Sequence, residues 1–305
     1  MLKTKNKYLR FVANAILFLF SIVIFDQLIG RTLKHYYFTS SSGDYYRTTY
    51  AMDSTKADII ILGSSRASHH YIPKLMEDSL SMSCYNTGRD GNYLLFNYAV
   101  FKSIIKRHNP KVFILDIYPS ELYQSENSYE GLSSLLPYYY DNPETQNIIG
   151  LRSKIEKYKM FSEVYPFNSK VIAICKGNLG SYNDNKFKGY LPLYGTTILQ
   201  NKPLLNNAED KKFDVNKINA IESMALICYQ KSIRFIVVQS PRYSIVNQKE
   251  ENEVLYKIMT KYNGIYYNLV NEPMFINNPG LFRDVPHLND LGAQLFTQLI
   301  IQKIK

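Results

Sequence analysis

The chain has 305 residues, of which 46% are hydrophobic, and a formal net charge of +10. This length can bury one large core, or one core together with a substantial insertion, which is enough for an enzyme. The charge does not favour nucleic-acid binding, because Lys3, Lys5, Lys7 and Arg10 crowd the first ten residues and the remaining excess is spread along the chain.

Residues 11–30 are dominated by Phe, Val, Ile and Leu and carry no charge before Asp26. At about 1.5 Å per residue, a helix of this length crosses a hydrocarbon core of roughly 30 Å. We predict a transmembrane anchor here, with residues 1–10 as a cytoplasmic basic tail and everything after Arg31 on the periplasmic or extracytoplasmic side of the cell (inner) membrane. A cleaved signal peptide is the alternative, but no small-x-small site follows the apolar run. A buried soluble helix is a second alternative, and the basic flank argues against it.

Residues 31–56 are polar and rich in tyrosine, and we predict a short stalk there. The globular domain is then expected over residues 57–305. Its short apolar runs predict strands buried on both faces, at 57–62, 111–118, 234–239 and 264–270. Helical periodicity predicts helices between and after them, at 93–107, 215–230, 250–262 and 290–304. This alternation indicates an α/β fold with a mostly parallel sheet, whose functional sites form at the carboxyl ends of the strands.

The alternation fails between residues 119 and 214, a stretch too long for an ordinary connection. We predict an insertion with helices of its own, such as one at 145–159, packed over the strand ends. Its many tyrosines suit either stacking on sugar rings or packing within the insertion, and packing is the simpler account for most of them.

The three cysteines, Cys84, Cys175 and Cys228, lack any C-x-x-C spacing. We expect buried thiols, although one disulfide stays possible. The sequence predicts no metal site and no cofactor.

Gly63-Ser64-Ser65 follows the first predicted strand. A hydroxyl there is displayed at the start of a helix, where free backbone N–H groups stabilise an oxyanion. Serine is also among the commonest helix N-caps, so the turn alone does not identify a nucleophile.

Asp284-Val285-Pro286-His287 lies just before the last predicted helix. A carboxylate three residues before an imidazole can hold the ring tautomer and leave the other ring nitrogen facing a hydroxyl. In combination with the serine turn, this motif predicts serine-dependent acyl transfer.

These residues resemble the SGNH, or GDSL-like, hydrolase superfamily, in particular its membrane-anchored bacterial members. The resemblance implies a three-layer α/β/α, flavodoxin-like parallel sheet, with Ser65 as nucleophile and Asp284 and His287 completing the triad. The Asn86-Thr-Gly88-Arg-Asp-Gly91 segment matches the family's second block, which implies that the Ser65 and Gly91 amides form the oxyanion hole.

The third block departs from the family, because Asp116-Ile-Tyr-Pro119 stands where Gly-x-Asn-Asp is expected. Loss of one oxyanion donor costs about 2.7 to 4 kcal/mol of transition-state stabilisation. Asn92 and Tyr118 are candidate replacements. Similar departures occur in anchored relatives that work beside a membrane-bound O-acyltransferase in polysaccharide or teichoic-acid modification.

The sequence therefore predicts an extracytoplasmic serine esterase or O-acyltransferase that acts on acyl esters of carbohydrate, with acetyl as the expected acyl group. Its partners would be an acylated glycan or cell-envelope polymer and a membrane-bound O-acyltransferase. The alternative is a non-catalytic glycan-binding or scaffold subunit of such a system. Arg66, His69 and Tyr118 are further candidates for substrate contact, while Arg66 pairing with a carboxylate and Asp116 lying on the surface are the simpler alternatives.

Overall fold

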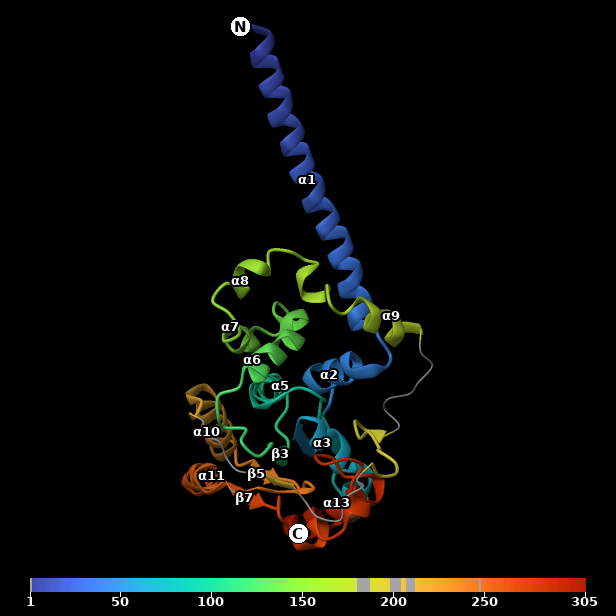
Figure 1. Ribbon diagram of the computed structural model, residues 1–305, viewed down its shortest axis with the longest axis vertical. Helices are drawn as coiled ribbons and strands as arrows, with labels where there is room; N and C mark the ends of the chain where they lie inside the picture. The colour runs from blue at the N-terminus through green and yellow to red at the C-terminus, as the bar shows by residue number, and fades with distance from the viewer. Residues whose placement is uncertain (1, 180–186, 198–203, 207–211, 247) are drawn as a thin grey trace.

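The computed structural model describes residues 2–179, 187–197, 204–206, 212–246 and 248–305. Helix α1 (Leu2–Phe38) projects from a domain in which helices surround a sheet (Figure 1). Within α1, residues 7–38 form a helix long and apolar enough to cross a membrane, and its most apolar stretch is not buried by the rest of the protein.

The main sheet has five parallel strands in the order β2-β1-β3-β5-β7. Their bounds are β1 Ile59–Gly63, β2 Cys84–Asn86, β3 Val112–Asp116, β5 Arg234–Gln239 and β7 Ile265–Asn268. The chain order reverses between β1 and β3, and the register there pairs Gly63 with Asp116 at the carboxyl ends. In open α/β sheets such a reversal opens a crevice for ligands. A separate parallel pair joins β4 (Leu204–Asn206) to β6 (Ser244–Val246).

Helices cover both faces of the sheet, because alternate strand residues belong to two different hydrophobic clusters. Ile60 and Leu62 of β1 pack with one group of helices, α2 Gly43–Asp53, α5 Leu94–Arg107, α10 Val215–Gln230 and α11 Lys249–Lys261. Ile59 and Ile61 pack with the other, α3 Ser65–His70, α4 Pro73–Leu80, α12 Pro273–Ile276 and α13 Asp290–Ile304. This arrangement confirms the predicted α/β class with a parallel sheet.

The four predicted strands and the four helices of the alternating pattern are present, with ends displaced by a few residues at most. Strand β2 was not predicted, since three residues are too few to show a period.

The predicted stalk at 31–56 is instead part of the folded domain. Helix α1 continues to Phe38, and Tyr37 near its end is fully buried, with its hydroxyl 3.2 Å from that of Tyr138. Helix α2 follows and buries Ala51 and Met52 in the main core. The aromatic and apolar side chains of this polar-looking segment explain the difference, because they face the domain and not water.

Besides strand β4, the described part of the 119–214 insertion contains short helices, namely α6 Glu126–Glu130, η1 Gly131–Tyr138, η2 Pro143–Thr145, α7 Gln146–Gly150, α8 Glu156–Lys159, η3 Tyr165–Phe167 and α9 Val171–Leu179. The helix expected at 145–159 is broken between α7 and α8, just after Gly150, a poor helix former. Short helix η5 (Pro279–Leu281) precedes α13. Residues 180–186, 198–203 and 207–211 of the insertion lie outside the described residues.

All three cysteines are free, so none forms a disulfide. Cys84 and Cys228 are buried as expected, whereas Cys175 is exposed on α9.

Candidate active site

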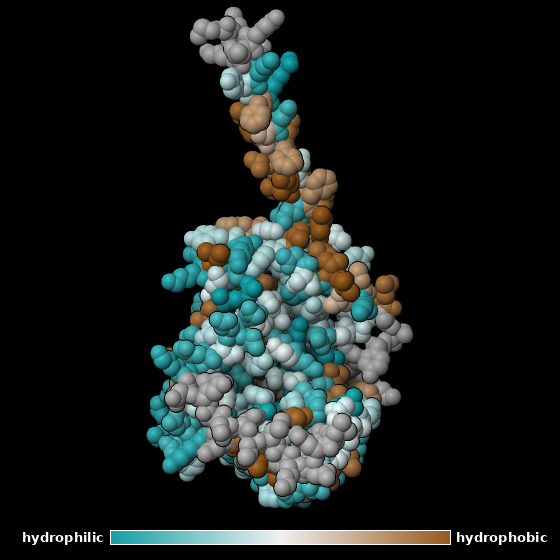
Figure 2. All heavy atoms as spheres, viewed as in Figure 1, coloured by the Kyte–Doolittle hydropathy of each residue, from teal (hydrophilic) through white to brown (hydrophobic). Residues whose placement is uncertain are grey.

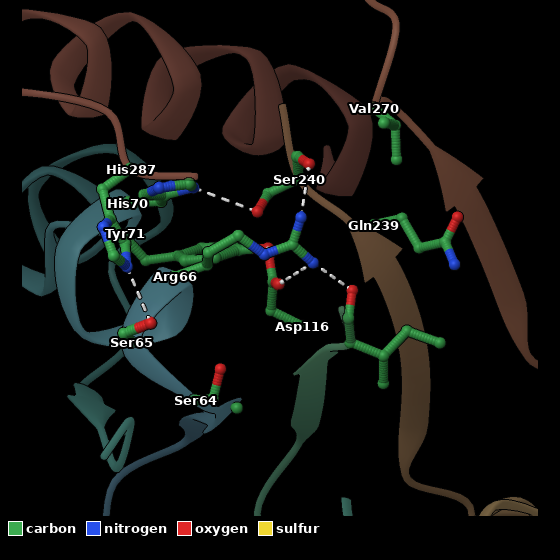
Figure 3. A network of polar contacts seen from close by, with 12 residues as sticks. Ser64, Ser65, Arg66, His70, Tyr71, Asp116, Gln239, Ser240, Val270 and His287 are labelled. Carbon is green, nitrogen blue, oxygen red and sulfur yellow. Dashed lines mark hydrogen bonds and ion pairs between the residues drawn. The ribbon is translucent and has the colours of Figure 1, made fainter. Parts of the chain in front are cut away.

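Ser65, His287 and Asp284 meet at the carboxyl end of β1. His287 Nε2 lies 2.8 Å from Ser65 Oγ (Figure 3). His287 Nδ1 lies 2.9 Å from Asp284 Oδ1. Since the carboxylate only accepts, Nδ1 carries the proton and Nε2 is left to accept from the serine hydroxyl. The hydrogen bond to the imidazole is made by Ser65 and not by Ser64, which precedes α3 and makes no side-chain cap.

The turn that presents Ser65 requires glycine at position 63. Gly63 has φ +153, and a Cβ there would lie 2.6 Å from Ala67 Cβ and 2.7 Å from the Asp116 carbonyl oxygen. Helix α3 can therefore start directly after β1 and close to β3. The Ser65 hydroxyl and the first amides of α3 consequently face the crevice between these strands.

A buried ion pair lies beneath the serine. Arg66 is 1% exposed, and its guanidinium lies 3.1 Å from Asp116 Oδ1. Asp116 also accepts from the Tyr71 hydroxyl at 2.6 Å. Arg66 donates further to the carbonyl oxygens of Ser240 and Ile117 (Figure 3). These contacts favour the pairing of Arg66 with a carboxylate over substrate contact, and they show that Asp116 is not a surface residue.

His70 links this network to the triad loop. Leu288 N–H donates to His70 Nε2 at 3.0 Å, so the ring proton is on Nδ1 and is donated to Ser240 Oγ, also at 3.0 Å. Burial lowers the pKa of His70 well below its usual range, and the nearby Arg66 charge acts in the same direction. His70 is thus neutral, and its hydrogen bond fixes the backbone of Leu288, the residue after His287.

A second imidazole, that of His69, packs edge-on against His287 with ring centroids 5.3 Å apart. His69 Nδ1 donates to the Leu191 carbonyl at 2.7 Å, and Nε2 lies 3.1 Å from Asp90 Oδ2. Burial opposes a charged ring, but the hydrogen bond and charge of Asp90 outweigh it and raise the pKa of His69. The pair ties α3 to the residue just before Gly91.

Gly91 and Asn92, two of the expected oxyanion-hole donors, differ in whether they are free to bind a ligand. Gly91 has φ +69, and a Cβ there would have no atom within 4 Å. Its amide makes no hydrogen bond within the described ranges, so it remains available to a ligand. The Asn92 side-chain amide is occupied, since it donates to the Asp90 carbonyl at 3.1 Å. Asn86 is structural: its side chain donates to the Ala67 and Tyr71 carbonyls and accepts from Gly88 N–H.

Tyr118 is half-buried beside two guanidiniums, since Arg66 Cζ and Arg242 Cζ are each 5.1 Å from its ring centroid. Arg242 is also buried and pairs with no carboxylate of the described chain, and desolvation lowers its pKa. The loop that carries Arg242 touches the triad loop, since Tyr243 N–H donates to the Val285 carbonyl at 2.7 Å.

Sequence reasoning missed Asp90 as the partner of His69 and Ser240 as the partner of His70. The available signal for Asp90 was its position inside the Asn86–Gly91 motif. The available signal for Ser240 was its position directly after the predicted strand 234–239, where Ser240-Pro241-Arg242-Tyr243 is expected to form a pocket wall, but its partners on α3 have no local signal. Across the described residues, no group of three or more His, Cys, Asp or Glu side chains is arranged to hold a metal ion.

Comparison with family models gave no match, and no curated protein is significantly similar to this chain.

Proposed function

We propose that this protein is a membrane-anchored serine esterase or O-acyltransferase of the SGNH type that acts on acyl, principally acetyl, esters of an extracytoplasmic carbohydrate. The observation that carries the proposal is the continuous chain from Ser65 Oγ through the His287 ring to Asp284, with links of 2.8 and 2.9 Å. The strand order β2-β1-β3-β5-β7, with helices on both faces, agrees with a flavodoxin-like three-layer arrangement.

In the proposed reaction, Ser65 Oγ attacks the ester carbonyl carbon while His287 Nε2 takes the hydroxyl proton. The negative charge on the carbonyl oxygen is stabilised by the Ser65 and Gly91 amides. Collapse of the tetrahedral intermediate expels the alcohol, which receives the proton from His287, and leaves an acyl-Ser65 ester. Water or a sugar hydroxyl, deprotonated by His287, then attacks this ester and regenerates the serine.

The proposed location rests on α1. Its basic N-terminal flank favours a cytoplasmic N-terminus, so the domain would stand on the periplasmic or extracytoplasmic face of the membrane. An acylated glycan or envelope polymer is the proposed substrate. A membrane-bound O-acyltransferase is the proposed partner.

A fluorophosphonate probe tests the proposal, because only an activated serine reacts with it. The full-length protein and the Ser64→Ala variant should be labelled, and the Ser65→Ala variant should not. Labelling that depends on Ser64 would reassign the nucleophile. Absence of labelling in the wild type would favour a non-catalytic glycan-binding or scaffold subunit.

Mass spectrometry of cell-surface glycans, with and without the gene, separates the two reaction directions. Glycans that gain acyl groups when the gene is removed imply an esterase, whereas glycans that lose them imply a transferase.

A further inference from the structure

The insertion contacts α1 at a level where α1 is still apolar. Asp26 of α1 accepts hydrogen bonds from Ser162 Oγ at 2.5 Å and from Glu163 N–H at 2.8 Å. Gly30 lies against the same segment, since a Cβ there would be 2.3 Å from Glu163 Cβ. Yet Leu28 and Ile29, between these two contact points, remain exposed. The segment after α8 therefore reaches the last turn of the exposed apolar run of α1.

The length of that run fixes where a bilayer would end. From Phe11 to Ile29 the helix rises about 28 Å, which matches a hydrocarbon core of roughly 30 Å. Ending the core before Asp26 would leave only about 22 Å, from Phe11 to Phe25, and would pull Arg10 into the hydrocarbon. A bilayer that accommodates α1 thus extends to Ile29, which places Ser162 and Glu163 at its boundary.

The surface beside this contact has the composition of a membrane interface. Helix α8 and its flanks lie on the side of the domain from which α1 emerges (Figure 1). Four side chains there are exposed, and we call them the apolar rim: Leu151, Ile155, Tyr158 and Phe161, the last 78% exposed. Lys154 and Lys157 accompany them and are exposed too. Figure 2 shows hydrophobic atoms both along α1 and on this end of the domain.

Each part of this surface suits lipid. Tyr and Phe favour the headgroup boundary, and Lys stems can lie along apolar surface while their ammonium groups reach phosphates. Lys157 Nζ lies 4.9 Å from the Tyr158 ring centroid, so the cation and the aromatic ring already share one face.

We propose that the apolar rim is a second membrane contact, inserted into the interfacial region of the same leaflet from which α1 emerges. The occupant is the lipid bilayer, because the rim is continuous with the lipid-facing surface of α1. The inference rests on α1 spanning the membrane, as proposed above, and it adds that the domain is docked onto the bilayer and does not hang freely from it.

The absence of tryptophan from the chain permits a direct test. Single-tryptophan variants of the full-length protein, Phe161→Trp, Phe18→Trp and Tyr256→Trp, are reconstituted into phosphatidylcholine–phosphatidylglycerol vesicles with and without lipids brominated on their acyl chains. Phe18 marks the centre of α1, and Tyr256 is an exposed residue of α11. We expect loss of emission with brominated lipid at positions 18 and 161, with shallow bromines most effective at 161, and no loss at 256.

The outcomes separate the two hypotheses. Quenching at position 18 with none at 161 would overturn the rim while leaving the span intact. Protection of position 161 from aqueous acrylamide without quenching by bromine would mean that a protein covers it, which also overturns the lipid contact. No quenching at position 18 would reject the span and the rim together. Tyr158→Trp gives an independent reading of the rim should the Phe161 variant fold poorly, and it should behave as position 161 does.

Discussion

His287 is held from both sides by groups that fix the position of its ring proton. Asp284 accepts from Nδ1 and also from the His287 backbone N–H at 3.0 Å. Neutral His70 accepts a hydrogen bond from the backbone N–H of Leu288, the next residue, and donates one to Ser240 Oγ. The Ser240 carbonyl in turn accepts a hydrogen bond from Arg66. The triad therefore rests on a buried polar network in which each ring tautomer is set by its partners. Networks of this kind fix one geometry, because any break leaves a buried polar group unpaired.

Asp284 is expected to hold the His287 ring in the tautomer that leaves Nε2 free. In Asp284→Asn the amide can also donate, so the ring is no longer held in the tautomer that leaves Nε2 free. We expect kcat on an acetyl ester to fall by about 10⁴-fold with little change in folding. Asp78→Asn, which removes an exposed carboxylate on α4, is the matched control and should keep full activity. Unchanged turnover in Asp284→Asn would show that Asp284 does not orient the base.

The His69–Asp90 pair is expected to make the stability of the fold depend on pH. The pKa of His69 is raised in the folded state, so its charged form stabilises the fold below the unfolded value of 6.5, and that stabilisation is lost as pH rises through the folded pKa. The pKa of Asp90 is lowered, despite burial, by the hydrogen bond from His69, so the carboxylate stays ionised across this range.

Chemical unfolding of wild type and Asp90→Asn measures this effect. The wild type should exceed the variant in free energy of unfolding near about pH 6, and the difference should shrink towards about pH 9. A difference that grows with pH would contradict an ionic His69–Asp90 pair.

At the scale of elements, the site depends on how closely α3 follows β1. Gly63→Ala adds a methyl group against Ala67 and the Asp116 carbonyl at a positive φ. We expect a loss of about 2 kcal/mol or more in unfolding free energy, together with loss of probe labelling. Gly150→Ala, where nothing lies within 4 Å of the added methyl, should be neutral or slightly stabilising. Equal behaviour of the two variants in thermal unfolding and labelling would show that the turn is not constrained.

The elements that could be predicted are those with a strong local pattern. Strand β5 (Arg234–Gln239) and helix α13 (Asp290–Ile304) match the predicted bounds, because continuous apolar runs and three-to-four periodicity are recorded in neighbouring residues. Strand β2, the break between α7 and α8 and the helical segment 31–53 were not predicted. Their conformation depends on partners distant in sequence, such as Tyr138 for Tyr37.

At the scale of the whole molecule, α1 is both a candidate anchor and part of the fold. Its 11–29 stretch is largely exposed and apolar, whereas Tyr37 near its end packs against Tyr45, Tyr138 and Phe167. Because the end of α1 packs into the core of the domain, the domain has little freedom to rotate relative to α1. Membrane attachment would therefore set the orientation of the triad as well as its location.

Truncation tests this coupling. A chain beginning at Arg31 retains Tyr37 and α2, so it should be soluble, fold cooperatively and react with the fluorophosphonate probe. A chain beginning at Ala57 loses Tyr37, Ala51 and Met52 from the core and should aggregate or unfold at markedly lower temperature. Equal melting temperatures for the two would show that residues 31–56 act only as a stalk.

The sequence by itself determined the α/β class, the apolar helix at the N-terminus and the two motifs that carry the triad, Gly63-Ser64-Ser65 and Asp284-x-x-His287. Buried strands, membrane-length helices and these short motifs are local patterns, which neighbouring residues record. Only the tertiary structure decided that the Ser65 hydroxyl, which the family resemblance already implied as the nucleophile, lies within hydrogen-bond distance of His287, that Asp116 and Arg66 form a buried ion pair below the site, and that the insertion contacts α1 at Asp26. The physical reason is that these contacts join residues far apart in the chain. Hydrogen bonds and ion pairs depend on distances that no local sequence pattern records.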